Sequence, residues 1–148
     1  MKLPKYEYLT EGEAKLFKFS SDGPKGKIKK LVVYSQMLEE DIYNIAFGDY
    51  DEETDSINDT VITNNSDSQK VLATVVSTLY VFTNKYPNFW VYATGSNPAR
   101  TRLYRMGITS NLEEILADFK VFGLSDEIWH EFKKGKEFEA FLVKRKIH

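Results

Sequence analysis

The chain has 148 residues, no cysteine and a formal charge of −2, from 20 lysines and arginines against 22 aspartates and glutamates. This length fits one domain, residues 1–148, that buries its own core, and the lack of cysteine excludes disulfides, thiolate zinc sites and cysteine nucleophiles. The chain starts without an apolar run long enough for a signal peptide, and no later segment is apolar enough to span a membrane, so we expect a cytoplasmic protein without a membrane partner.

The chain begins with the pattern of a β-hairpin. Residues 14–20 place Phe17 and Phe19 on one face and Lys18 on the other, the period of two that is typical of a half-buried strand. The glycines and the proline of "SDGPKGK" predict a turn. Residues 28–34 are rich in β-branched side chains and are predicted to form the returning strand.

A third and a fourth strand are predicted after the hairpin. Tyr43, Ile45 and Phe47 alternate with smaller residues in "IYNIAFGDY", which predicts a strand over residues 42–50. The acidic stretch "DEETDSIND" predicts an exposed turn, and "TVITNN", residues 60–65, is predicted to be the fourth strand of the meander.

The longest helix is predicted over residues 66–86. Ser66 and Gln69 have the spacing of a capping box, and Pro87 marks the end of the helix. Its predicted core-facing stripe consists of Leu72, Val75, Val76, Leu79, Phe82 and Tyr86.

The second half of the chain combines short strands with two short helices. "FWVYAT" predicts a strand, and the next helix is predicted to begin at Pro98 with Asn97 as its N-cap. Ser110 and Glu113 predict a second capping box, for a helix over residues 111–119. The residues of that helix expected to face inward are Leu112, Ile115, Leu116 and Phe119.

Two closing strands are predicted, near residues 119–124 and 136–146. In the last strand Phe138, Ala140 and Leu142 are expected to face inward and to alternate with Glu139, Phe141 and Val143. The order ββββαβααββ predicts an α+β fold with a mainly antiparallel, meandering sheet of about six to seven strands, covered by one long helix and accompanied by two short ones.

Charge is unevenly distributed along the chain. Residues 31–69 contain ten acids and no lysine or arginine, and removing ten negative charges from −2 leaves the rest of the chain at +8. We therefore expect an electrically two-sided molecule with a basic face.

Three arginines lie on the helix predicted from Pro98. At about 100° per residue, Ala99, Leu103 and Met106 share the edge expected to face the core. Arg102 and Arg105 are neighbours on one flank, and Arg100 lies beside Tyr104 on the other. Adjacent like charges cost about 0.2–0.5 kcal/mol unless an anion joins them.

These arginines follow a Gly-Ser turn and lie near the start of a helix, where free N–H groups attract anions. Guanidinium groups pair bidentately with phosphate or carboxylate, Gly95 would allow close backbone approach, and Ser96 and Asn97 would donate or cap. The predicted anion-binding residues are Gly95, Ser96, Asn97, Arg100, Arg102 and Arg105. The alternative is that the arginines pair with the acidic segment and hold the helix to the sheet.

Other kinds of site find less support. "GSNPAR" invites comparison with the Gly-Ser turn of minimal nucleotidyltransferases, but Asp118 stands alone, whereas that family needs a pair of acids one residue apart on a strand to bind magnesium. An EF-hand loop starting at Asp49 would need glycine and glutamate where Thr54 and Thr60 stand. His130 and His148 define no catalytic triad. We expect no metal and no cofactor.

Basic and aromatic residues also permit contact with single-stranded nucleic acid. The residues proposed for such contact are Lys25, Lys27 and Lys29 around the first hairpin, together with Tyr104. Lys144, Arg145 and Lys146 close the last strand with further positive charge.

The blocks "GPKGKIKK", "AFGDYDEET", "TNNSDSQKVLATV" and "YATGSNPARTRLYR" resemble an uncharacterised bacterial domain family of Bacteroidetes-type organisms. This resemblance covers nearly the whole chain and implies a bacterial, cytoplasmic, single-domain protein, with no activity and no catalytic residues to transfer. The architecture alone is similar to the half-units of Whirly-type and PUR-type nucleic-acid-binding folds, without a shared motif.

The sequence thus predicts a non-enzymatic anion-binding module, most concretely one for single-stranded nucleic acid. One alternative is an enzyme or regulator that acts on a nucleotide or other phosphorylated small molecule near Gly95, Ser96 and Arg100. Another is a protein-interaction module in which the acidic and basic faces meet in a homodimer.

Overall fold

The computed structural model describes residues 4–39, 41–58 and 62–147. Its elements are β1 (Leu9–Glu11), β2 (Leu16–Gly23), β3 (Gly26–Gln36), β4 (Ile42–Asp51), β5 (Ser56–Ile57), α1 (Ser68–Lys85), β6 (Trp90–Ala93), α2 (Pro98–Ser110), α3 (Leu112–Asp118), β7 (Phe119–Ser125), β8 (Ile128–Glu131) and β9 (Ala140–Arg145). No helix within the described ranges is long and apolar enough to cross a membrane.

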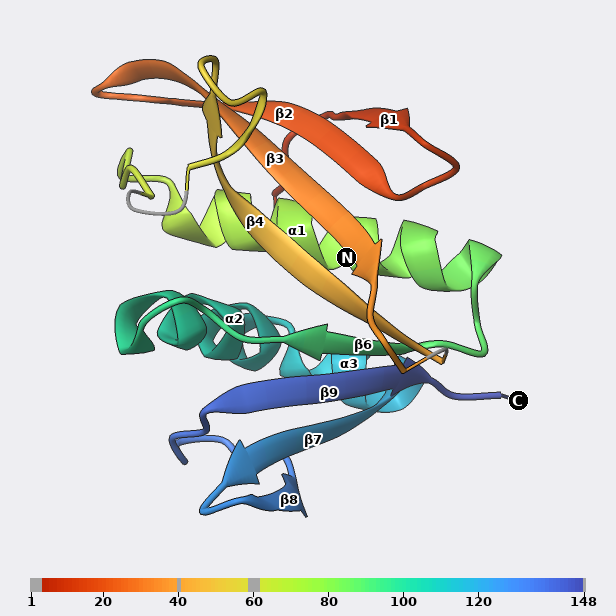
Figure 1. Cartoon of the computed structure of the whole chain (residues 1–148). Coiled ribbons are helices and arrows are strands. Elements are labelled where there is room, and N and C mark those ends of the chain that lie inside the picture. The colour runs from red at the N-terminus through yellow and green to blue at the C-terminus, as the bar shows by residue number, and fades with distance from the viewer. Residues whose placement is uncertain (1–3, 40, 59–61, 148) are drawn as a thin grey trace.

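The strands form one sheet in the order β1-β2-β3-β4-β6-β9-β7-β8, and β5 pairs with β4 outside this path. All pairings are antiparallel except that between β4 and β6, which is parallel. The three helices lie behind the sheet in Figure 1, so one face is covered and the other is open. The α+β class and the mainly antiparallel sheet are confirmed.

The predicted element order is wrong in detail. Residues 62–65 form no strand, and residues 60 and 61 of the predicted fourth strand lie outside the described part of the chain. β1, β5 and β8 were not predicted, because each has only two to four residues and offers little periodicity. Asn65 is instead a buried connector whose side chain bonds Lys25 N and Gly26 O, at 2.8 Å each.

Helix α1 forms as predicted, but its start differs. The N-cap residue is Asp67 and makes no side-chain capping bond, whereas Ser66 has a φ of +61°. The predicted Ser66–Gln69 capping box is therefore wrong. The carboxylate of Asp67 instead accepts from the Tyr6 hydroxyl at 2.6 Å and from Ser21. The core-facing stripe is confirmed, with Phe82 fully buried.

The second capping box is also wrong. Asn111 precedes α3 without a side-chain cap, and its amide donates to Gly107 O at 3.0 Å. Ile115 is buried as expected, but Leu116 is 40% exposed, because a helix of seven residues presents only one narrow face to the core.

The core is aromatic and lies between the sheet and α1. Tyr34 of β3 and Phe82 of α1 stack with centroids 4.2 Å apart, and the Tyr34 hydroxyl shares a hydrogen bond of 2.9 Å with Thr78. Phe17 and Phe19 of β2 and the alternating residues of β4 also join this core, as predicted.

The alternation predicted for the last strand is out of phase. Phe141 and Val143 face the core beneath the helices, while Leu142 is only half-buried on the opposite face. Phe138 precedes β9 and packs against Gly123 of β7, where an added Cβ would lie 2.3 Å from the ring. The core-facing residue is thus even-numbered before β9 (Phe138), whereas the core-facing residues within β9 are odd-numbered (Phe141 and Val143).

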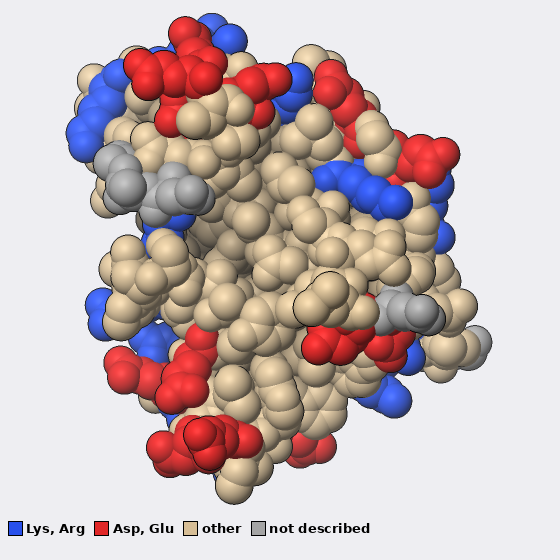
Figure 2. All heavy atoms as spheres, viewed as in Figure 1, with Lys and Arg blue, Asp and Glu red and all other residues tan. Residues whose placement is uncertain are grey.

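Basic and acidic residues lie next to each other rather than on separate sides of the molecule. β3 pairs with β4, which places Lys30 opposite Asp49 in a buried ion pair. Figure 2 shows lysines, arginines and acids along the rim of the open sheet face and few charges in its middle. The expected division into an acidic and a basic side is wrong for this region.

Candidate functional site: an arginine pocket beside helix α2

The turn from β6 into α2 is built as the sequence predicts. The Asn97 side chain accepts from Arg100 N at 2.9 Å, which confirms it as the N-cap, and Pro98 is the first helical residue. The Thr101 hydroxyl accepts from Gly95 N at 3.0 Å and donates to Asn97 O at 3.2 Å. These hydrogen bonds hold the β6–α2 loop against the first turn of helix α2.

Gly95 serves this packing. A Cβ on Gly95 would lie 2.4 Å from Arg100 Cβ and 2.5 Å from Thr101 N. The close approach that the sequence suggested for a ligand is thus made by α2 itself. Ser96 is exposed and lies outside the pocket described below.

Helix α2 is rotated relative to the prediction. Ala99 and Met106 are exposed, whereas Thr101, Gly107 and Ile108 are buried. Gly107 faces α1, since an added Cβ would lie 3.7 Å from Leu72, in ordinary van der Waals contact. The expected core edge of Ala99, Leu103 and Met106 is therefore wrong, although Leu103 does pack partly on the core.

The three arginines have three different surroundings. Arg100 donates from its guanidinium to the backbone carbonyl of Asn58 at 2.8 Å. Arg105 reaches the carboxylate of Glu137 at 3.9 Å, and the Glu137 side chain is 82% exposed. Arg102 is exposed and makes no ion pair with any residue that the structure describes.

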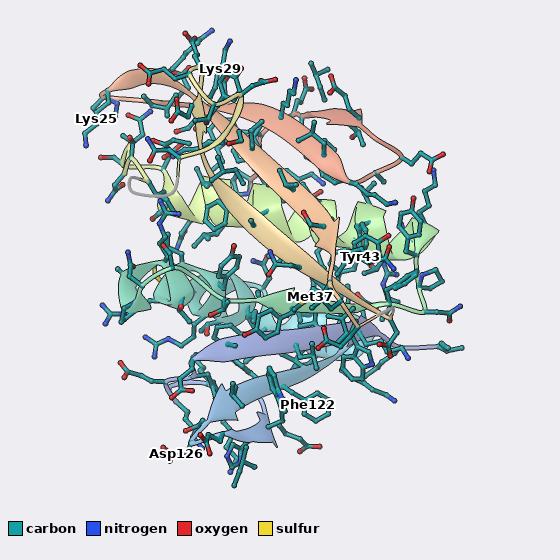
Figure 3. All side chains as sticks on the ribbon, in the orientation of Figure 1. Lys25, Lys29, Met37, Tyr43, Phe122 and Asp126 are labelled. Carbon is teal, nitrogen blue, oxygen red and sulfur yellow. The ribbon has the colours of Figure 1, made fainter. Side chains whose placement is uncertain are left out.

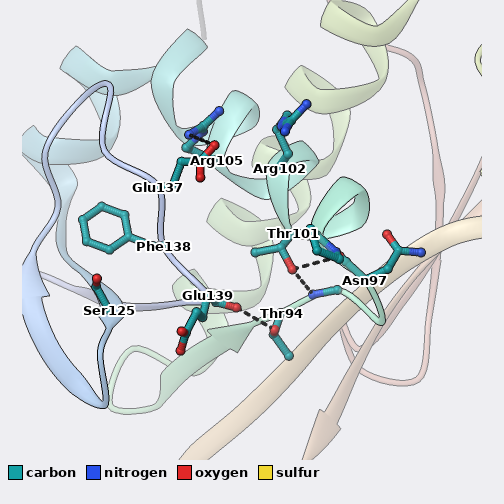
Figure 4. Close-up of a pocket in the computed structure, with 11 residues that line it drawn as sticks. Thr94, Asn97, Thr101, Arg102, Arg105, Ser125, Glu137, Phe138 and Glu139 are labelled. Carbon is teal, nitrogen blue, oxygen red and sulfur yellow. Dashed lines mark hydrogen bonds and ion pairs between the residues drawn. The ribbon is translucent and has the colours of Figure 1, made fainter.

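Arg102 and Arg105 line a pocket of about 500 Å³, which we call the arginine pocket. One wall is the β6–α2 turn with α2, and the other is the end of β7 with the segment before β9 (Figure 4). Its lining residues are Thr94, Gly95, Asn97, Pro98, Thr101, Arg102, Arg105, Ser125, Glu137, Phe138 and Glu139.

The wall from residues 125–139 was not predicted. The pairing of β6 with β9 sets Ala93 opposite Phe141, and the Thr94 hydroxyl then donates to Glu139 O at 2.9 Å. Glu137 and Glu139 thereby stand across from the arginines. Only the sheet order brings these segments together, and no local pattern in the sequence indicates it.

The residues predicted to contact nucleic acid lie elsewhere. Lys25, Lys27 and Lys29 are exposed on the β2–β3 hairpin, where Figure 3 labels Lys25 and Lys29, and none of them lines the arginine pocket. Tyr104 packs edge-on against Phe47 and donates to Ile45 O at 3.3 Å. Burial raises the pKa of Tyr104 to about 12, so this residue belongs mainly to the core.

The acidic turn after β4 does not form a cation cage. Asp49 pairs with Lys30, the Asp51 carboxylate accepts from Glu53 N at 2.9 Å, and Asp55 accepts from the Tyr50 hydroxyl at 2.7 Å. Within the described ranges, no group of three histidines or acids is arranged to hold a metal ion.

Fold and pocket together define an α+β protein with a polar pocket at one end of its sheet. The chain belongs to the family of unknown function DUF6934, whose model matches residues 2–146. No curated protein and no solved structure matches it. The family agrees with the expected uncharacterised domain, while a bacterial origin and a cytoplasmic location stay predictions.

Proposed function

We propose that this protein is a non-enzymatic binding module whose arginine pocket takes a small molecule that carries a phosphate or carboxylate group. The observation that carries the proposal is the state of Arg102 and Arg105. They are neighbours one turn apart on α2, Arg102 has no described ion-pair partner, and Arg105 has only a distant, exposed one. An anion between them would remove their mutual repulsion.

The size of the pocket favours a small ligand. A volume of about 500 Å³ lies within the range of about 300–1,000 Å³ that is usual for small-molecule sites.

The opposite wall restricts the kind of molecule. Glu137 and Glu139 would repel a ligand that is anionic throughout, but their carboxylates accept hydrogen bonds from hydroxyl or amino groups. The best match is therefore a molecule with an anionic group at one end and donors at the other, such as a sugar phosphate, a nucleotide or an amino acid.

A calorimetric and thermal-shift screen tests this proposal. Ribose 5-phosphate, adenosine monophosphate, aspartate and inorganic phosphate are titrated into the protein, and we expect at least one of the organic anions to bind. The variants Arg102→Gln and Arg105→Gln each lose a charge-assisted bidentate contact, so each should weaken binding by about tenfold or more.

Arg100→Gln is the matched control on the same helix. Its guanidinium contacts Asn58 O and does not line the pocket, so this variant should keep the wild-type affinity. The proposal is wrong if no organic anion binds the wild-type protein, or if Arg102→Gln and Arg105→Gln bind as tightly as Arg100→Gln.

A further inference from the structure

A second hollow lies at the other end of the sheet. It has a volume of about 770 Å³ and is formed where the segment before β1 passes the strands β2 and β3 and the first turn of α1. We call it the lysine–tyrosine groove, after the lysines and tyrosines in its lining: Lys5, Lys18, Lys29, Lys30, Lys70, Tyr6, Tyr8 and Tyr50.

The groove carries an excess of positive charge that the protein leaves available. Lys29 and Lys70 make no ion pair with any residue in the described ranges, and the Lys5 ammonium donates to the Ser77 hydroxyl at 3.4 Å. Glu7 also lines the groove and offsets one of these positive charges. Lys18 pairs with Glu11 at 3.6 Å, but both side chains are about half exposed, so water weakens the pair. Lys30 at the floor is fully neutralised by Asp49 and contributes no free charge.

Two ammonium groups of this groove lie against aromatic rings, and the Tyr6 ring also stacks on Phe19 with centroids 5.9 Å apart. The Lys70 ammonium lies 4.2 Å from the centre of the Tyr6 ring, and that of Lys29 lies 5.9 Å from the centre of the Tyr50 ring. Nucleic acid presents the complementary pair of groups, since phosphates bind ammonium groups and unpaired bases stack on aromatic rings.

The positive charge continues from the groove along the hairpin. Successive side chains of a strand point to opposite faces, so Lys27 and Lys29 of β3 share a face. Lys25 follows at the turn of the hairpin and is also exposed. Figure 3 shows Lys25 and Lys29 projecting from this end of the molecule, so the lysines mark a path along which a flexible strand could lie.

Charge distinguishes this groove from the other aromatic surface of the protein. Trp90, Tyr92 and Trp129 lie on the open face of the sheet. The ring centroids of Tyr92 and Trp129 are 6.3 Å apart. That surface carries both signs of charge, since the β7–β8 turn holds Asp126 and Glu127 and the Lys144 ammonium lies 5.5 Å from the centre of the Trp90 ring. The lysine–tyrosine groove has more lysines than acids, although Glu7 is part of its lining and Asp55 accepts from the Tyr50 hydroxyl.

We propose that the lysine–tyrosine groove and the adjoining hairpin lysines bind single-stranded nucleic acid, independently of the arginine pocket. A single strand exposes both its phosphates and the faces of its bases, while a duplex hides the faces from the rings. About four phosphate contacts from Lys18, Lys27, Lys29 and Lys70 would make the binding strongly dependent on salt.

Fluorescence anisotropy with a labelled oligothymidine of about 12 nucleotides tests this inference. We expect binding at about 50 mM salt and an affinity about 50-fold lower at about 200 mM salt, as four released counterions require. The variant K18Q/K29Q/K70Q should bind about tenfold more weakly or worse, and K27Q/K29Q should change the affinity in the same direction.

Two controls separate the groove from general charge and from the arginine pocket. K85Q/K120Q/K133Q removes the same charge from exposed lysines outside the groove and should stay within about twofold of wild type. R102Q/R105Q should keep its affinity for the oligonucleotide even if it loses the small ligand. The inference fails if the wild type does not bind at low salt, if the control triple variant weakens binding equally, or if a duplex of the same length binds as tightly.

Discussion

Lys30 of β3 and Asp49 of β4 form a buried ion pair, although each comes from a charged stretch of the chain. The register of β3 and β4 sets them opposite each other, and both become buried. Lys30 also donates to Thr63 O at 2.9 Å, and Asp49 accepts from Thr63 N at 3.0 Å, so the pair fixes the segment that leads to α1.

Removing one partner of this ion pair should destabilise the protein much more than replacing both partners by apolar residues. Lys30→Met leaves a buried carboxylate without its partner, so we expect the free energy of unfolding to fall by about 3–5 kcal/mol. The double variant Lys30→Met/Asp49→Leu removes both charges and should recover a large part of that loss. Urea denaturation measures the wild type, the single variants Lys30→Met and Asp49→Leu, and the double variant. A double variant that loses at least the sum of the two single variants would show that the residues do not stabilise each other.

At the level of elements, the helix caps offer a paired test. Asn97 caps α2 through its side chain, so Asn97→Ala should lower the free energy of unfolding by about 1 kcal/mol. Ser110 has the sequence signature of a cap, but the N-cap position of α3 belongs to Asn111, so Ser110→Ala should change stability by less than about 0.5 kcal/mol. Chemical denaturation compares the two, and an equal loss in both variants would restore the predicted capping box.

The elements also show what the sequence can and cannot predict. Long periodic segments such as α1 and β4 are recognisable, because their buried residues repeat over several turns or pleats. Caps and two-residue strands depend on a few hydrogen bonds and were predicted less well. The half of the arginine pocket that the β6–α2 turn forms can be predicted from the sequence, because this turn is local. The positions of Glu137 and Glu139 in the pocket cannot be predicted in this way, because they depend on the insertion of β9 between β6 and β7.

For the whole molecule, the sheet keeps the two candidate sites apart. The arginine pocket lies between α2 and the segment that leads into β9, and the lysine–tyrosine groove lies among β1, β2 and β3. These strands stand in different parts of the sheet order (Figure 1), and the aromatic core lies between the sheet and α1. The two sites therefore offer separate charges to separate ligands, which is why variants of one can serve as controls for the other.

The aromatic core also gives the whole protein an alkaline limit. Burial raises the pKa of Tyr34 above its ordinary value and that of Tyr104 to about 12. In the unfolded chain both hydroxyls ionise near pH 10, while in the folded chain they stay protonated. Above about pH 10 the unfolded state binds fewer protons, so the free energy of unfolding falls as pH rises.

We expect a loss of about 3 kcal/mol from these two groups between about pH 8 and about pH 11, measured by urea denaturation at each pH. Tyr34→Phe removes one of the two ionising hydroxyls. It starts from a lower stability because it loses the hydrogen bond to Thr78, but its further loss over the same pH range should be smaller by about 1 kcal/mol. An identical pH dependence in Tyr34→Phe and wild type would mean that the Tyr34 hydroxyl does not link the core to pH, since each buried tyrosine must contribute its own proton to the difference between the two states.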